Sequence, residues 1–187
     1  MVEKEQARKI VSDIRKTLSS DNVDTMSALI FNRLQSIEEF INTRTIFLYS
    51  PIRNEADTVL IQKFAFERNI KLAYPKVTGN EMLFYEVNTP HDLTKGYMNI
   101  LEPVNGLKIC NDESGVIIVP GNAFDSKCNR IGYGKGFYDR YLSKYNKLTK
   151  IGICFGFQLF DDLCTNEFDI SMDYVITENL TIKKEII

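Results

Sequence analysis

Hydrophobic residues recur every three or four positions in two stretches near the start of the chain, which predicts two amphipathic helices. The first helix is expected over residues 3–19, and its apolar stripe consists of Ala7, Ile10, Val11, Ile14 and Leu18. The second is expected over residues 24–41, with Asp24 as a candidate cap. The side chains that line one side of this helix are Leu29, Arg33 or Leu34, Ile37 and Ile41.

Short apolar runs bounded by proline, glycine or polar residues alternate with further helical patterns along the rest of the chain. These runs predict strands over residues 45–50, 71–75, 82–87, 116–119, 150–155 and 174–177. Helices are expected over residues 57–68 and directly after Gly136. Because strands and helices alternate, the pattern predicts the α/β class, with a mostly parallel sheet, helices on both faces and one domain over residues 1–187.

Three segments give weaker signals. Residues 90–111 show little periodicity and are expected to form a long loop, of a length that is often functional in a compact domain. Tyr97 and Met98 in this loop could also simply cover an edge of the sheet. Residues 158–164 predict a short helix or turn, and residues 179–187 are expected to be peripheral.

The stretch over residues 116–145 combines a buried strand, a glycine-rich loop and a helix. Alternate positions of the loop are occupied by Gly132, Gly134 and Gly136. Such a loop directs backbone N–H groups and a helix N-terminus at one point, where an anion is favoured. Lys135 adds a point charge, and Arg130 adds a planar fork of donors for phosphate oxygens. The alternative is a tight structural turn with no ligand.

Neither of the two common phosphate-loop patterns fits this loop. The G-x-x-x-x-G-K-[ST] pattern needs serine or threonine after its lysine, whereas Gly136 follows Lys135. The dinucleotide pattern is G-x-G-x-x-G, whereas the spacing here is G-x-G-x-G. The residues alone therefore indicate a nucleotide- or phosphate-binding α/β domain and leave the second substrate open.

Two carboxylates are candidates for a magnesium site. Asp139 lies in the first turn of the helix after the glycine loop, and Asp169 lies in an acidic segment over residues 166–173. Magnesium is usually held by one or two carboxylates together with phosphate oxygens and water. Asp139 could instead be a helix-start acid paired with Arg140.

Three further charged residues allow two interpretations each. Glu55 follows the end of a predicted strand, where ligands bind in open α/β sheets, but a helix dipole would also favour an acid there. Lys4 and Arg8 are one turn apart on the first predicted helix. They form either a solvated cationic edge or a clamp for phosphate groups.

Composition narrows the classes of function. A net charge of −2 and a pI of about 5.6 argue against nucleic-acid binding. The single histidine, His91, disfavours zinc sites and most catalytic triads. Four cysteines without C-x-x-C spacing, a charged N-terminus and the lack of a long apolar run predict free thiols in a cytoplasmic protein that does not cross a membrane. We expect a monomer.

The residues VPGNAFDSKCNRIGYGKGFYDRYL, at positions 119–142, closely resemble the signature of the 5-formyltetrahydrofolate cyclo-ligase family, also called 5,10-methenyltetrahydrofolate synthetases. The likeness spans more than twenty residues at fixed spacing, so it is far more specific than a count of glycines. Further similar segments occur in the family's order along the whole chain: Lys4 to Arg8, Glu55 to Thr58, Glu102 to Pro103 and Asp169 to Thr177.

Three positions of the signature depart from the family pattern. Cys128 stands where the family usually has glycine, Ile131 replaces leucine, and Phe137 replaces a tyrosine. The last two changes are mild, although Phe137 has no hydroxyl group to donate a hydrogen bond.

The resemblance implies a fold and a reaction. The fold is an α/β/α sandwich like that of the sugar-phosphate isomerase and CoA-transferase group, which agrees with the alternation of elements. The reaction is an ATP- and Mg²⁺-dependent ring closure of 5-formyltetrahydrofolate to 5,10-methenyltetrahydrofolate, in which the formyl oxygen is phosphorylated and then leaves as phosphate. Phosphoryl transfer needs mainly positioning and charge neutralisation, which a chain with one histidine can supply.

The resemblance also assigns roles to residues at matching positions. ATP would be bound by Lys4, Arg8, Arg130, Ile131, Gly132, Tyr133, Gly134, Lys135, Gly136, Phe137 and Tyr138. Arg130 and Lys135 would act in catalysis by neutralising the developing charge, and Asp139 and Asp169 would hold Mg²⁺. The folate would be bound by Ser50, Glu55, Tyr133, Gly134, Lys135, Gly136 and Phe137, with Glu55 accepting pterin N–H groups. Further candidates for the folate pocket are Ile52 and the Tyr97–Met98 loop.

Two rival functions stay open from the sequence. A non-catalytic nucleotide- or folate-binding relative that kept the loop would bind ATP without turnover. A different enzyme on the same fold, such as a sugar-phosphate isomerase, would consume no ATP.

Overall fold

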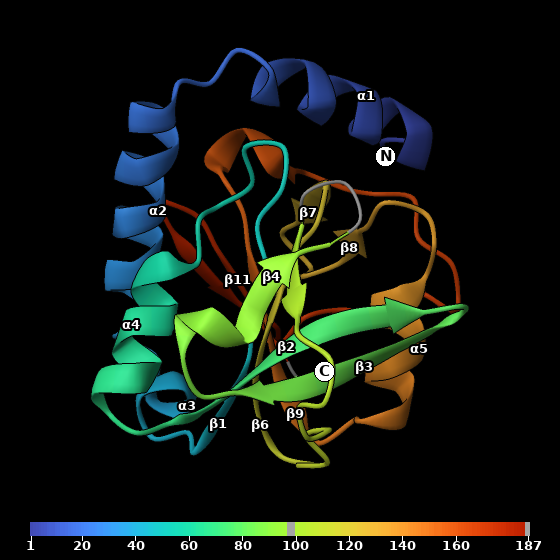
Figure 1. Ribbon diagram of the computed structural model, residues 1–187. Coiled ribbons are helices and arrows are strands. Elements are labelled where there is room, and N and C mark those ends of the chain that lie inside the picture. Colours follow the sequence, from blue (N-terminus) through green and yellow to red (C-terminus); the bar gives the residue numbers. More distant parts are fainter. Residues whose placement is uncertain (97–99, 186–187) are drawn as a thin grey trace.

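The computed structural model describes residues 1–96 and 100–185, and its centre is a seven-stranded sheet with the order β12-β11-β9-β6-β1-β2-β3 (Figure 1). The parallel strands at its centre are Tyr174–Ile176 (β11), Leu148–Ile153 (β9), Gly115–Val119 (β6), Thr45–Phe47 (β1) and Lys71–Thr78 (β2). Antiparallel strands form the two edges: Thr181–Lys183 (β12) and Glu81–Val87 (β3). The predicted mostly parallel sheet is therefore confirmed.

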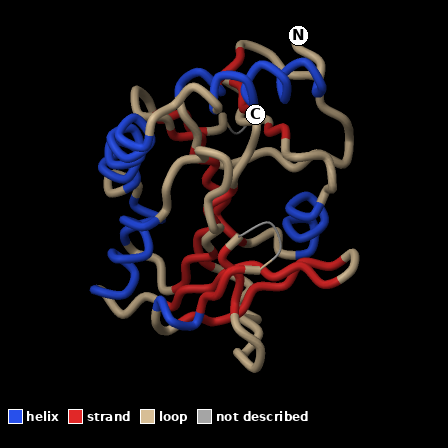
Figure 2. The backbone as a smooth tube through the Cα atoms, turned by 45° about the horizontal axis from the view of Figure 1, so that its top comes forward, coloured by secondary structure: helices blue, strands red, loops and turns tan. Residues whose placement is uncertain are grey.

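Helices cover both faces of this sheet, which confirms the three-layer α/β/α prediction (Figure 2). One face packs against Ser20–Leu34 (α2), Glu38–Ile41 (α3) and Val59–Glu67 (α4), and the other against Phe137–Lys144 (α5). The side chains of β6 alternate between the two cores: Val116 and Ile118 enter the first, whereas Ile117 and Val119 enter the second. Burial on both faces explains why this strand is a continuous apolar run.

The prediction of one helix over residues 24–41 is wrong, because the structure has α2 over Ser20–Leu34 and a separate short helix, α3, over Glu38–Ile41. The helix starts four residues earlier because Ser19 caps it: the Ser19 side chain accepts from the Asn22 backbone N–H, and the Asn22 side chain accepts in return from the Ser19 N–H. A turn after α2 then separates it from α3, which brings both Ile37 and Phe40 into the core. Leu29, expected on the apolar side, is exposed.

Two further predictions about strands and loops need correction. The strand expected to stop at Pro75 continues to Thr78. Proline is tolerated there because β1 pairs with β2 only as far as Ala73, so no β1 residue lies opposite Pro75 to accept a hydrogen bond from its nitrogen. The expected loop over residues 90–111 contains the antiparallel pair Leu93–Lys95 (β4) and Leu101–Pro103 (β5), preceded by a short 3₁₀ turn at Pro90–Asp92. Tyr97 and Met98 lie outside the described residues.

The ends of the chain and a small second sheet complete the fold. The tail predicted to be peripheral contributes β12, while Ala123–Asp125 (β7), Arg130–Ile131 (β8) and Leu159–Phe160 (β10) form a three-stranded sheet. Gly156–Gln158 is a 3₁₀ turn. Cys128 has a φ of 63° in the turn between β7 and β8, so it adopts the left-handed conformation that glycine takes more easily.

The first helix, Lys4–Arg15 (α1), packs on β7 and β8 by a stripe that shares Ala7 and Val11 with the predicted one but not Ile10. Ala7, Val11 and Arg15 are buried, whereas Ile10 is exposed. A long cationic side chain takes a buried position here because its guanidinium finds oxygen partners inside the protein. In the part of the chain that the structure describes, no helix combines the length and hydrophobicity of a bilayer span.

Candidate active site

A cavity of about 1120 Å³ opens where the strands β1 and β6 end. These two strands are parallel neighbours, but the chain continues from β1 toward β2 on one side and from β6 toward β9 on the other. Such a point, where the strand order reverses, leaves a crevice at the carboxyl ends of the strands in which ligands bind. The segments that follow β1 and β6 therefore form two opposite walls of one cavity.

The wall after β6 carries the glycine loop. Gly134 and Gly136 have φ values of +94° and +65°, a backbone conformation that is unfavourable for residues with a side chain. Gly136 leads directly into α5. The first N–H groups of a helix have no partner within it, so those of α5 are available to an anion. Lys135 lines the cavity and is exposed. Arg8 donates from Nε to the Gly132 carbonyl at 3.0 Å, which places its guanidinium beside the loop.

Arg130, which is buried, and Asp139, which is partly buried, form an ion pair beside this loop. Arg130 Nη2 donates to Asp139 Oδ1 at 2.8 Å, and its Nη1 donates to the Pro120 carbonyl at 3.2 Å. The open question of the Asp139 partner is thus answered: it is Arg130, whereas Arg140 donates to the carbonyls of Lys135 and Asn80. The Arg130 side chain is 3% exposed, so its position is set by the pair and not by solvent.

The second predicted magnesium ligand lies beside the first. Asp139 Oδ1 also accepts from the backbone N–H of Ile170 at 3.3 Å, so the Asp169 backbone runs past the Asp139 carboxylate. Asp169 Oδ2 accepts from Lys4 Nζ and from the Asn166 N–H. Among the described residues no donor reaches Oδ2 of Asp139 or Oδ1 of Asp169. Two carboxylates, each with one oxygen left over, fit a magnesium ion that takes its other ligands from phosphate and water.

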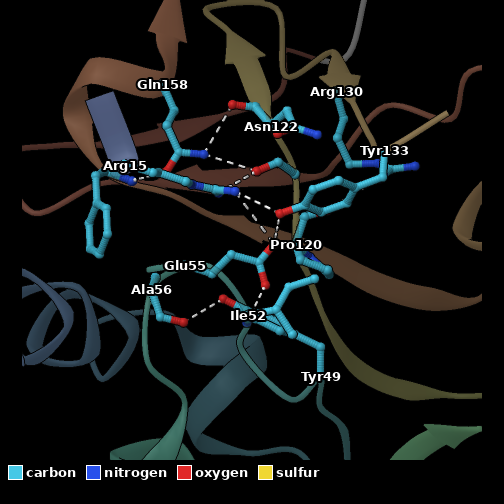
Figure 3. Close-up of polar contacts among 12 residues, drawn as sticks. Arg15, Tyr49, Ile52, Glu55, Ala56, Pro120, Asn122, Arg130, Tyr133 and Gln158 are labelled. Atoms are coloured by element: carbon cyan, nitrogen blue, oxygen red, sulfur yellow. Dashed lines mark hydrogen bonds and ion pairs between the residues drawn. The ribbon is translucent and has the colours of Figure 1, made fainter. Parts of the chain in front are cut away.

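The wall after β1 carries a buried carboxylate, Glu55 (Figure 3). Its Oε2 accepts from the Ile52 backbone N–H at 3.0 Å, and its Oε1 accepts from the Tyr133 hydroxyl at 2.7 Å. Arg15 Nη1 donates to the same hydroxyl at 2.7 Å and lies 3.8 Å from Glu55 Oε1. Tyr133 belongs to the glycine loop, so its hydroxyl joins the two walls.

Burial and the neighbouring cation act in opposite directions on the Glu55 carboxyl. Loss of solvent raises the pKa of Glu55 above its ordinary value, and this effect outweighs the opposing influence of the Arg15 charge and of the hydrogen bonds from Ile52 and Tyr133. Burial and the nearby Glu55 carboxylate likewise raise the pKa of the Tyr133 hydroxyl, which therefore stays protonated and can donate.

The cavity brings together every predicted site residue that lies within the described chain. Those residues are Lys4, Arg8, Ser50, Ile52, Glu55, Arg130, Ile131, Gly132, Tyr133, Gly134, Lys135, Gly136, Phe137, Tyr138, Asp139 and Asp169. Their individual roles stay predictions. The sequence did not point to Arg15 or Phe168. The one signal for Arg15 was its place four residues after Val11 on the helical stripe. Phe168 is an aromatic residue at the cavity that is 75% exposed and belongs to no periodic pattern.

The cavity lies where the strand order of a parallel sheet reverses. On one side it has a glycine loop with cations, and on the other a buried carboxylate. These features define an α/β protein of the phosphate- or nucleotide-binding class. A model of the 5-formyltetrahydrofolate cyclo-ligase family matches residues 1–178. The chain belongs to the 5-formyltetrahydrofolate cyclo-ligase family, as its resemblance to the family signature predicted.

Individual relatives agree with this assignment. A probable 5-formyltetrahydrofolate cyclo-ligase of Schizosaccharomyces pombe is 30% identical, over 97% of this chain and 98% of its own. The structure of a 5,10-methenyltetrahydrofolate synthetase of Aquifex aeolicus superposes with a TM-score of 0.84 at 36% identity, over 96% of this chain and 92% of its own. That of Mycoplasma pneumoniae gives 0.71 at 28% identity, over 94% and 98%. The family is one of ligases in folate one-carbon metabolism, and membership supports cyclo-ligase activity.

Proposed function

We propose that this chain, as one domain and a monomer, closes the ring of 5-formyltetrahydrofolate to give 5,10-methenyltetrahydrofolate, with ATP converted to ADP and phosphate. The observation that carries the proposal is the single cavity into which the glycine loop with Lys135 and the buried Glu55 carboxylate both open. One wall suits a polyphosphate and the other suits a ring with N–H donors. Two substrates held this way meet between the walls.

The proposed chemistry is two displacements. The formyl oxygen attacks the γ-phosphorus of ATP, and the bond from that phosphorus to the bridging oxygen breaks, so ADP leaves. The N10 lone pair then attacks the formyl carbon, the carbon–oxygen bond breaks, and phosphate departs with its electron pair while N10 loses its proton to solvent. Phosphorylation is required because an amide oxygen is a poor leaving group. The protein's part is to align the reactants and to neutralise charge.

The residues divide this work by position. Lys135, Arg8 and the N–H groups at the start of α5 bind the triphosphate, and Lys135 balances the charge that develops on the transferred phosphoryl group. Asp139 and Asp169 would hold Mg²⁺, which when bound supplies further positive charge to the phosphate oxygens. Arg130, being buried against Asp139, contributes by orienting that carboxylate.

Glu55 orients the folate in this scheme. Its carboxylate is held rigidly by the Ile52 N–H and the Tyr133 hydroxyl, and it can accept further hydrogen bonds from two pterin N–H groups. Ser50 and Ile52 lie on the same wall, with the Ser50 hydroxyl donating to the Leu101 carbonyl of β5 at 2.6 Å. The antiparallel pair of β4 and β5 is thereby tied to the folate side of the cavity.

One assay tests the proposal directly. Protein mixed with 5-formyltetrahydrofolate, Mg²⁺ and ATP is expected to produce the methenyl chromophore, with one ADP formed per product. Leaving out ATP is expected to abolish the absorbance rise. A non-catalytic relative would bind ATP and the folate without any rise, and that result would overturn the proposal.

Replacing Glu55 with glutamine is expected to lower kcat/KM for 5-formyltetrahydrofolate by about 10- to 150-fold, since a hydrogen bond to a charged group contributes about 1.5–3 kcal/mol. The KM for ATP is expected to stay within about twofold, because Glu55 lies on the opposite wall from Lys135. Initial rates with each substrate varied in turn measure both constants.

A matched control exists on the far side of the molecule. Glu39 also accepts a hydrogen bond from a tyrosine hydroxyl, that of Tyr174 at 2.8 Å, but it does not line the cavity. Glu39→Gln is expected to leave both constants unchanged. If Glu55→Gln binds and converts the folate as well as the parent protein does, Glu55 has no role in folate binding.

A further inference from the structure

Arg15 is a buried cation that does not line the cavity but touches both of its walls from behind (Figure 3). It is the last residue of α1, and its side chain is 5% exposed. One end of its guanidinium donates to the Tyr133 hydroxyl and lies beside Glu55 Oε1, while Nη2 donates to the Gly121 carbonyl at 2.9 Å. Gly121 is the second residue after the end of β6.

We infer that Arg15 is a positioning residue that locks the Glu55 carboxylate and the Tyr133 hydroxyl into one arrangement, and so sets the pH range in which the folate-binding wall is functional. This inference rests on the proposed function of the cavity. In this proposal Arg15 does not touch either substrate. It acts through Glu55 on the folate side and through Tyr133 on the nucleotide loop.

The surroundings of Arg15 show that the contact is built into the fold. Asn54, which precedes Glu55, donates from Nδ2 to the Arg15 carbonyl at 2.8 Å and to the Leu18 carbonyl at 3.3 Å. Arg53 and Asn54 both have positive φ values, 49° and 55°, so the turn before Glu55 is in a conformation that needs support from its neighbours. The end of α1 and the residues after it give that support, because their carbonyls accept hydrogen bonds from the residue directly before Glu55.

The Gly121 carbonyl is shared between two donors on this inner side of the cavity. Gln158 Nε2 donates to it at 2.9 Å, and Arg15 Nη2 does so as well. Gln158 is held in turn because its Oε1 accepts from the Phe155 N–H at 3.1 Å. The guanidinium thus lies in a polar layer whose partners are themselves oriented, and only a planar fork reaches Gly121 and Tyr133 together.

The charges around Glu55 give Arg15 a specific electrostatic effect. Two cations act on the carboxylate, Arg15 and Arg53, and three tyrosines interact with it electrostatically, Tyr49, Tyr133 and Tyr138. Burial raises the pKa of Glu55, and the Arg15 charge is the largest influence that lowers it. Without Arg15 the carboxyl would bind its proton at higher pH, and it could then no longer accept hydrogen bonds from two pterin N–H groups with both oxygens.

The test is the pH profile of kcat/KM for 5-formyltetrahydrofolate in Arg15→Gln. In the parent protein this constant rises with pH as Glu55 ionises. In the variant the acidic limb is expected to move to higher pH by about one to three pH units, the range that a nearby opposite charge contributes. The profile of kcat/KM for ATP is expected to keep its shape. A purely structural defect would lower the constant by the same factor at every pH, and that result would overturn the inference.

Two further variants keep the test decisive if Arg15→Gln does not fold. Arg15→Lys keeps the charge but not the fork, so its acidic limb is expected to stay near that of the parent while kcat/KM falls. Tyr133→Phe removes the hydroxyl between Arg15 and Glu55 and is expected to move the limb to higher pH. The inference is wrong if the acidic limb of the pH profile keeps its parent position in Tyr133→Phe and moves to higher pH in Arg15→Lys.

Arg33 is the matched control, because its guanidinium also donates to two backbone carbonyls, those of Glu178 and Asn179, but at a distance from the cavity. Arg33→Gln is expected to leave the pH profile unchanged.

Binding of 5-formyltetrahydrofolate without ATP, measured by calorimetry across the same pH range, gives a readout besides turnover. Failure of the parent protein to form methenyl product overturns the proposed function, whereas an active parent with unshifted variants overturns only the role of Arg15.

Discussion

Lys135→Ala is expected to lower kcat by about 100- to 1000-fold, the usual effect of removing one preorganised group that stabilises developing charge. Lys135 lies at the centre of the glycine loop and lines the cavity, and none of the ion pairs found among the described residues includes it. Its charge is therefore free to act on the transferred phosphoryl group. Single-turnover formation of the methenyl chromophore with saturating ATP measures this step apart from binding.

The same variant is expected to fold as the parent does, with a free energy of unfolding within about 0.5 kcal/mol of it, because Lys135 is exposed. Lys147→Ala provides the matched control: Lys147 is an exposed lysine paired with Glu113 and lies outside the cavity. It is expected to leave kcat unchanged. Parent-like turnover in Lys135→Ala would show that the loop binds phosphate without contributing to its transfer.

Asp139→Ala is expected to destabilise the fold by about 3–5 kcal/mol, the cost of leaving the partner of a buried ion pair uncompensated. The Arg130 side chain is only 3% exposed, so its charge would lose its carboxylate partner while staying largely buried. Turnover is expected to fall below detection as well, because Asp169 would be the one candidate carboxylate ligand for Mg²⁺ that remains. Urea unfolding followed by circular dichroism gives the first quantity, and the methenyl assay over a series of Mg²⁺ concentrations gives the second.

Stability and catalysis separate in a double variant. Replacing Arg130 with methionine and Asp139 with leucine removes both charges, and apolar residues in place of a buried ion pair are often neutral for stability. The double variant is expected to recover most of the unfolding free energy and none of the turnover. Turnover in the refolded double variant would mean that neither Arg130 nor Asp139 takes part in the reaction.

The local features of the fold could be predicted because they depend on neighbours in the chain. The run Val116–Val119, the glycines from Gly132 to Gly136 and the helical spacing after them predicted a strand, a loop and a helix, and the structure has β6, the loop and α5 in those places. The capping of α2 by Ser19 could also have been found, since Ser19 and Asn22 are only three residues apart. The continuation of β2 past Pro75 could not, because it depends on how far β1 extends beside it.

The sequence by itself determined the α/β class, the glycine-rich loop and the family, since periodicity, glycine spacing and a signature of adjacent residues all lie within short segments. Only the tertiary structure decided which charges meet. Tyr133 reaches Arg15 across 118 residues and Glu55 across 78, and Asp139 pairs with Arg130 instead of the adjacent Arg140. The physical reason is that a charged side chain can be buried only where the packing of distant elements brings an oriented partner to it, and no local pattern records which partner that is.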